Sequence, residues 1–132
     1  MLLHSLCLIT VLLAGQLETT FSVEYGGNKY DFRITEEDLK ATPGWPAGQD
    51  NPPLSARRAI DIASKYLATL LPNGKDWRLY QVTLRPIDSH WIYVVEFLEP
   101  LRADAAGQLS SGFQVVVLMN GVAVAPQVSR QN

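Results

Sequence analysis

Cysteine and histidine are scarce in this sequence: Cys7 is the single cysteine, and His4 and His90 are the only histidines. One cysteine cannot form a disulfide within the chain, and the cysteine-rich ligand sets of structural zinc sites cannot be assembled. The sequence also has no HExxH motif, no calcium-binding loop with alternating oxygen ligands and no phosphate-binding glycine loop. We therefore predict neither a metal nor a cofactor.

Long runs of charge of one sign are missing too. The 132 residues contain 11 Lys and Arg against 13 Asp and Glu, which gives a formal charge of -2, and these charges are spread along the chain. A protein that binds nucleic acid or an anionic membrane surface needs a basic patch or stripe. We therefore expect no nucleic acid partner. A chain of this length buries one hydrophobic core, which predicts one domain of ordinary size.

A hydrophobic run opens the sequence. Residues 1–15 read MLLHSLCLITVLLAG, which has the length of the apolar part of a secretory signal and is short for a membrane-spanning helix. We interpret residues 1–22 as a signal peptide, cleaved after Ala14 or Gly15, or later at Ser22. The protein is then exported, to the periplasm or the extracellular space. No Lys or Arg precedes the run, so an uncleaved amino-terminal anchor stays open as an alternative and as the one expected membrane contact.

Residues 23–53 are expected to form a hairpin followed by a connector. Apolar residues alternate with polar ones after a glycine-rich turn at 26–28, as in a strand hairpin; they are Tyr30, Phe32 and Ile34. The sequence TEED at 35–38 supplies an N-cap and acidic residues for the start of a short helix that runs to about Lys40. The acids Glu36, Glu37 and Asp38 are thereby explained as partners of the helix dipole.

The connector, residues 42–53, contains four of the eight prolines and two glycines, so it is neither a helix nor a central strand. Trp45 lies in its middle. Its indole either packs over the edge of the core or acts as an aromatic anchor for a partner.

Residues 54–128 predict a helix and a sheet. The segment from Ser55 to Leu71 has an N-cap, a broad apolar stripe and a stop at Pro72-Asn73-Gly74. Three segments with strand patterns follow: WRLYQVTLRPI, WIYVVEFL and FQVVVLMNGVAVA, the last folded about Asn120-Gly121. The expected fold is α+β, with one long helix packed on an antiparallel sheet of three to four strands and with an N-terminal hairpin.

This order of a capped helix at 55–71, then WRLYQVTL, WIYVVEF and FQVVVLMNGVAV, resembles the cystatin-like arrangement and in particular PepSY-type domains, over about residues 54–125. The resemblance implies a non-catalytic exported domain that restrains peptidases or binds other envelope proteins. Leu118-Met119-Asn120-Gly121 departs from the acidic residue and small-residue turn that PepSY domains commonly have before their last strand. The glycine and the Gln-rich hairpin loop of cystatin inhibitors are not recognisable either, so no functional residue is carried over.

Catalysis has one candidate base, His90 in the sequence IDSH. An enzyme would need His90 to meet Asp88 and one of the hydroxyls of Ser89, Ser110 or Ser111. Asp and Ser favour turns, so we predict a turn residue here and no enzyme. Glu96 falls in a strand pattern, and we expect an ion pair with Arg78 or Arg85 on a neighbouring strand.

One face of the predicted strands is too apolar to be open to water. It carries Ile92, Val94, Leu98, Val116 and Leu118. The N-terminal hairpin with Trp45 could cover it, or a second protein, or a second copy in a homodimer; with Trp45, these five residues are our candidates for partner binding. We predict an exported binding module for a protein or peptide, peptidase-inhibitory in one version. The alternatives are an accessory or structural subunit of an envelope or extracellular complex and, third, a hydrolase that uses His90.

Overall fold

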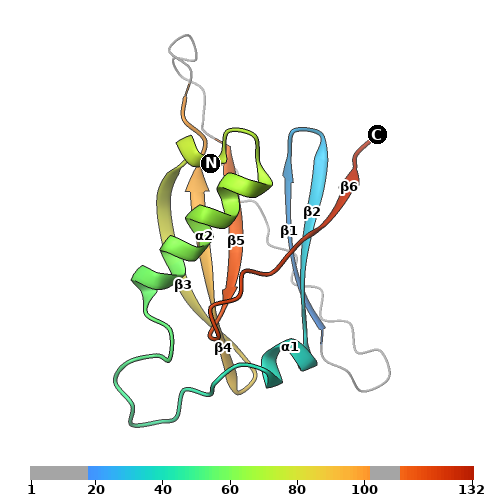
Figure 1. Cartoon of the computed structure of the whole chain (residues 1–132). Coiled ribbons are helices and arrows are strands. Elements are labelled where there is room, and N and C mark those ends of the chain that lie inside the picture. The colour runs from blue at the N-terminus through green and yellow to red at the C-terminus, as the bar shows by residue number, and fades with distance from the viewer. Residues whose placement is uncertain (1–17, 102–110) are drawn as a thin grey trace, which may run out of the picture.

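The computed structural model describes residues 18–101 and 111–132. Its strands form two antiparallel sheets of three strands each, and one long helix lies across the second sheet (Figure 1). The elements in chain order are β1 (Glu18–Tyr25), β2 (Asn28–Thr35), α1 (Glu36–Lys40), α2 (Ala56–Leu70), the 3-10 helix η1 (Gly74–Asp76), β3 (Arg78–Ile87), β4 (His90–Leu98), β5 (Gly112–Leu118) and β6 (Gln127–Arg130). The strand orders are β1-β2-β6 and β3-β4-β5.

The first sheet starts with the predicted hairpin. Gly26 and Gly27 both have positive φ, 61° and 79°, which glycine adopts at little cost, and they connect the paired residues Tyr25 and Asn28. Aromatic and aliphatic side chains of the hairpin are buried on one face; they are Phe21, Tyr30, Phe32 and Ile34. On its other edge β2 pairs with β6, with Tyr30 opposite Val128.

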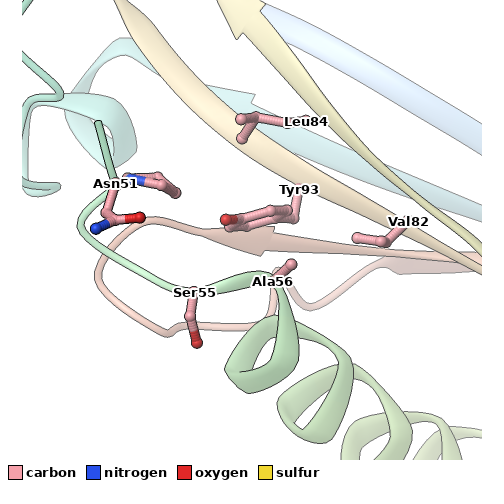
Figure 2. Close-up of a pocket in the computed structure, with 7 residues that line it drawn as sticks. Asn51, Ser55, Ala56, Val82, Leu84 and Tyr93 are labelled. Atoms are coloured by element: carbon pink, nitrogen blue, oxygen red, sulfur yellow. The ribbon is translucent and has the colours of Figure 1, made fainter. Parts of the chain in front are cut away.

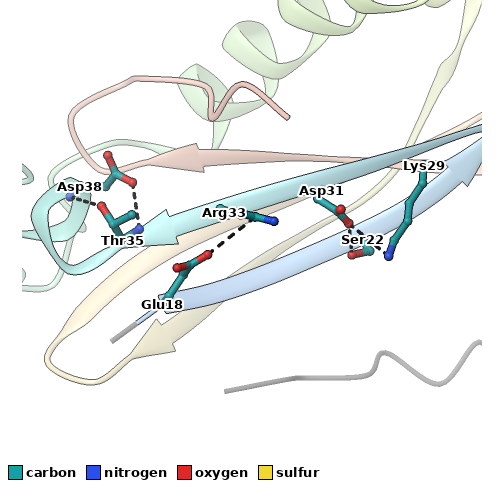
Figure 3. A network of polar contacts seen from close by, with 7 residues as sticks. All are labelled: Glu18, Ser22, Lys29, Asp31, Arg33, Thr35 and Asp38. Atoms are coloured by element: carbon teal, nitrogen blue, oxygen red, sulfur yellow. Dashed lines mark hydrogen bonds and ion pairs between the residues drawn. The ribbon is translucent and has the colours of Figure 1, made fainter. Parts of the chain in front are cut away.

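The short helix α1 begins as predicted, with a capping box. The Thr35 hydroxyl accepts a hydrogen bond from the Asp38 amide at 3.1 Å, and the Thr35 amide donates to the Asp38 carboxylate at 2.9 Å (Figure 3). Two ion pairs of the hairpin are drawn in the same view: Lys29 with Asp31 at 3.8 Å and Arg33 with Glu18 at 3.7 Å. Such exposed pairs contribute little to stability.

The long helix α2 starts at the predicted N-cap, because the Ser55 hydroxyl accepts a hydrogen bond from the Arg58 amide at 3.2 Å. Its buried side is narrow and consists of Ala59, Ala63 and Leu67. The helix contacts β4 and β5 with this side. These residues and the inward side chains of both sheets form one hydrophobic core.

The predicted architecture is wrong, although the class is α+β. A single sheet of three or four strands in cystatin-like order was expected, but there are two separate three-stranded sheets, and strands contain more of the described residues than helices do. The expected hairpin about Asn120-Gly121 is reduced to one bridge, between Val117 and Ala123. Pro126 has no amide to continue that pairing, and the chain crosses to β2 as β6 (Figure 1).

The expected segments can be placed on the described strands and core. Residue 22 lies inside β1, and the hairpin expected at 23–53 shares its core with the segment 54–128. Within the described residues, no helix has both the length and the hydropathy that crossing a bilayer requires.

Candidate functional site

A pocket of about 440 Å³ lies between the start of α2 and the second sheet (Figure 2). We call it the α2–β3 pocket. Its lining comes from the connector, the first residues of α2, and strands β3 and β4; the residues are Asn51, Pro52, Ser55, Ala56, Val82, Leu84 and Tyr93. The pocket is partly open to solvent. Its volume is in the range of sites that accept small ligands or single side chains of a partner.

Strand register explains why three apolar side chains meet in this pocket. Leu84 and Tyr93 are cross-strand partners, so they point to the same face of the sheet. Val82 is two residues from Leu84 in the same strand and shares that face. The helix α2 begins above this face but buries only its small alanines there, which leaves room beside the β3 edge.

Tyr93 fixes the connector to the sheet. Its side chain is buried, and its hydroxyl donates a hydrogen bond to the Leu54 carbonyl at 2.6 Å. A tyrosine hydroxyl is protonated and can donate at neutral pH, and burial raises the pKa of this one further above its ordinary value. With the Ser55 hydroxyl used as the helix cap, the lining has no carboxylate, imidazole or thiol. This pocket can select a ligand by its shape and its apolar surface, but its lining has no acid and base pair for catalysis.

β3 has a free edge beside the pocket. The strand pairs with β4 on one side and with no strand on the other in the described chain. Two of its large apolar side chains are exposed, Leu79 by 46% and Tyr80 by 59%. A bulge between Leu79 and Gln81 interrupts the register near one end, and Pro86 lies near the other. The regular stretch between them is an open template for another strand.

The candidate partner-binding face is covered within this chain. Ile92, Val94, Val116 and Leu118 are buried, and Leu98 is partly buried. Arg85, the cross-strand partner of Ile92, lies with its guanidinium carbon 5.4 Å from the centre of the Phe21 ring, which places β1 on this side. The first four residues therefore belong to the core, and Leu98 lies at its margin.

Trp45 also packs within the chain. Its ring meets Trp91 edge to face, with centroids 5.2 Å apart, and its Nε1 donates to the Gln49 carbonyl at 2.9 Å. The indole is partly exposed, so it fits the interpretation that it packs over the edge of the core.

His90 starts β4 after a two-residue turn. Asp88 has φ 51°, a left-handed conformation that Asp tolerates, and Ile87 pairs with His90 across the turn. The Nδ1 atom of His90 is buried and has no hydrogen-bond partner among the described residues. No hydrogen bond joins it to Asp88, Ser89 or Ser111; Ser110 lies outside the described residues. The described chain also contains no cluster of three or more potential metal ligands.

Glu96 differs from the expectation. Its carboxylate accepts a hydrogen bond from the Gln81 amide at 2.8 Å and forms no ion pair with Arg78 or Arg85. Gln81 is its cross-strand partner, so the nearest donor is neutral. The Arg85 guanidinium lies over Phe21 instead.

The α2–β3 pocket was missed from the sequence. The alternation of Val82 and Leu84 gives the face on which they lie, but not the point at which the helix begins above that face. The proline-rich connector that ends at the N-cap Ser55 marks where the helix begins, but not where that start lies over the sheet. No protein-family model matches the chain, and no curated protein and no solved structure matches it. The resemblance to PepSY domains therefore stays a prediction.

Proposed function

We propose that this chain is a binding module that accepts an extended segment of another protein as an additional strand along β3. Apolar side chains of that segment would enter the α2–β3 pocket. In strand addition, main-chain hydrogen bonds supply affinity, and pockets for alternate side chains supply specificity. The proposed place of action is outside the cytoplasm, as the apolar run at residues 1–15 predicts.

The observation that carries this proposal is that a free strand edge and an apolar pocket adjoin each other. Val82 and Leu84 belong to the edge strand and also line the pocket. A segment paired with β3 therefore places every second side chain on the same face as Val82, Leu84 and Tyr93. The lining has no catalytic pair, which favours binding over turnover.

A displayed library of random peptides, selected on the purified full chain, tests the proposal. We expect enriched peptides to have apolar residues at alternate positions. Leu84→Gln should weaken their binding, measured by fluorescence anisotropy, about tenfold or more, because it places an amide in the apolar pocket. Thr83→Gln is the matched control: it lies on the same strand, points to the opposite face and is exposed. The Thr83→Gln chain should bind the enriched peptides as tightly as the original chain does.

Backbone methylation separates strand addition from simple pocket filling. In an added strand, alternate amides face β3, so N-methylation of one alternate set should abolish binding and methylation of the other set should be tolerated. Thermal melting of both variants checks that they fold. Enrichment of no peptide, or equal binding to the Leu84→Gln and Thr83→Gln chains, would refute the proposed function.

A further inference from the structure

The distribution of ion pairs in the described chain is uneven. All three pairs lie in the first sheet and α1: Lys29 with Asp31, Arg33 with Glu18, and Lys40 with Glu36 at 3.0 Å. The basic residues of α2 and β3 form none with the described residues; they are Arg57, Arg58, Lys65, Arg78 and Arg85. None of these five cations therefore has a carboxylate of the described residues within ion-pair distance.

Arg57 and Arg58 follow directly on Ser55 and Ala56, which line the pocket, and both are exposed. The first turn of α2 contains these two cations and no acid. The other α-helix of the described residues has the opposite arrangement, since α1 has three acids in its first turn and Lys40 in its last. Cations at the start of a helix oppose its dipole, so they cost stability that a nearby anion would restore.

β3 carries Arg78 and Arg85 and no acidic residue. The Arg85 guanidinium lies over Phe21, on the face away from the pocket. The nearest acids along the chain are Asp50 and Asp61, and neither forms an ion pair with Arg57 or Arg58. The start of α2 beside the pocket therefore presents two exposed cations, which an acidic segment complements.

From this we infer, resting on the proposed function, that the segment that pairs with β3 is acidic: it has apolar side chains where it crosses the α2–β3 pocket and carboxylates beside Arg57 and Arg58. Alternate side chains of a strand project to the same side, so a carboxylate two residues from an apolar side chain in the pocket also faces α2, where Arg57 or Arg58 can meet it. A basic segment would be repelled at the same place.

Three end-blocked peptides test this inference. They share identical apolar residues at two alternate positions and have Glu, Gln or Lys at the next alternate positions, which lie on the same face, so only their charge differs. The Glu peptide should bind the full chain roughly tenfold more tightly than the Lys peptide, with the Gln peptide between them, as two exposed charge pairs allow. Added salt should reduce this difference, because it screens exposed charges.

Charge reversal on the chain provides the matched variants. The double change Arg57→Glu and Arg58→Glu should reverse the order of the Glu and Lys peptides. This double change places acids in the first turn of α2, which favours the helix. A weaker binding of the Glu peptide can therefore not be attributed to unfolding. Lys65→Glu alters an exposed cation of the same helix farther from the pocket and should leave the order unchanged.

The outcomes separate this inference from the proposed function. Equal binding of the three peptides, with sensitivity to Leu84→Gln retained, would refute the acidic partner and leave the binding edge in place. Binding of library peptides but of none of the three would also refute the acidic partner. If the chain instead paired its own β3 edges, sedimentation would show a dimer that excludes peptides, and both proposals would fail.

Discussion

Gly74 is a position where the backbone of one element leaves no space for a side chain. It follows the end of α2 and begins η1, and its amide donates to the Leu71 carbonyl at 3.0 Å. A Cβ atom there would overlap the Leu67 carbonyl oxygen and lie 2.6 Å from its carbon and 3.0 Å from the Ala68 Cα. All three atoms belong to the main chain of the last turns of α2, so no side chain can rotate away.

We therefore expect Gly74→Ala to lower the free energy of unfolding by about 3 kcal/mol, the upper part of the range for overpacked sites. Urea unfolding followed by tryptophan fluorescence measures this difference. Gly44→Ala is the control, because a Cβ atom at that position would have no atom within 4 Å apart from those of its two chain neighbours, and the φ of Gly44 is ordinary. Equal stability of the two variants would show that the turn after α2 can move away from the helix.

Single residues with local roles were predictable from the sequence. Thr35 and Ser55 were assigned as helix caps from the residues that follow them, and both accept the expected hydrogen bonds. The partner of Glu96 was not predictable, because it depends on register: Gln81, not an arginine, is the residue opposite. Proximity in the chain fixes a cap, whereas a cross-strand contact is fixed only when two distant strands have paired.

At the scale of elements, the N-cap of α2 allows a test on stability alone. The Ser55 hydroxyl satisfies the Arg58 amide, which otherwise has no partner inside the helix. Ser55→Ala should lower the free energy of unfolding by about 1 kcal/mol. Ser64→Ala is the same chemical change at an exposed position within α2, where alanine favours the helix, and it should be neutral or slightly stabilising. Urea unfolding of both variants checks this, and a loss of similar size at both positions would contradict the capping role.

Two strands were not identified correctly from the sequence, for different reasons. β6 has only four residues, all exposed, so it has no alternation to detect, and its partner β2 is far away in the chain. β1 begins at Glu18, within the segment interpreted as a signal peptide. Cleavage after Gly15 would leave β1 whole, whereas cleavage at Ser22 would remove Phe21, whose ring is buried and contacts Arg85.

At the scale of the whole molecule, aromatic side chains join the two sheets into one core. Phe113 of β5 meets Tyr30 and Phe32 of β2 edge to face, with centroids 5.0 and 6.1 Å apart, and it also meets Trp77 at 6.2 Å. Trp77 in turn meets Tyr25 at the end of β1, at 5.1 Å. The packing of helix on sheet could be predicted from amphipathic patterns, but the docking of the first sheet could not, because its contacts are made between residues with no regular spacing.

Tyr25 connects the two sheets through its hydroxyl, and this contact predicts how stability depends on pH. The hydroxyl donates to the Glu99 carboxylate at 2.6 Å. Burial, and then the hydrogen bond to Glu99 and its negative charge, raise the pKa of Tyr25 above the ordinary value of 10.0. The same direction holds for Tyr66 and Tyr93, whose pKa is raised by burial. These hydroxyls lose their protons at a lower pH in the unfolded chain than in the folded chain. Their contribution to stability is therefore complete below a pH of about 10 and is lost as the pH rises above it.

We expect the free energy of unfolding to fall as the pH rises above about 10, and to fall less steeply in Tyr25→Phe than in the original chain. At neutral pH the variant should be less stable by about 1 kcal/mol, because it lacks the hydrogen bond to Glu99. In the alkaline range this gap should close, since ionisation removes the same bond from the original chain. Urea unfolding followed by circular dichroism at a series of alkaline pH values measures both curves. A gap that stays constant over the whole series would show that Tyr25 ionises equally easily in the folded and the unfolded chain, and that its contact with Glu99 does not contribute to holding the two sheets together.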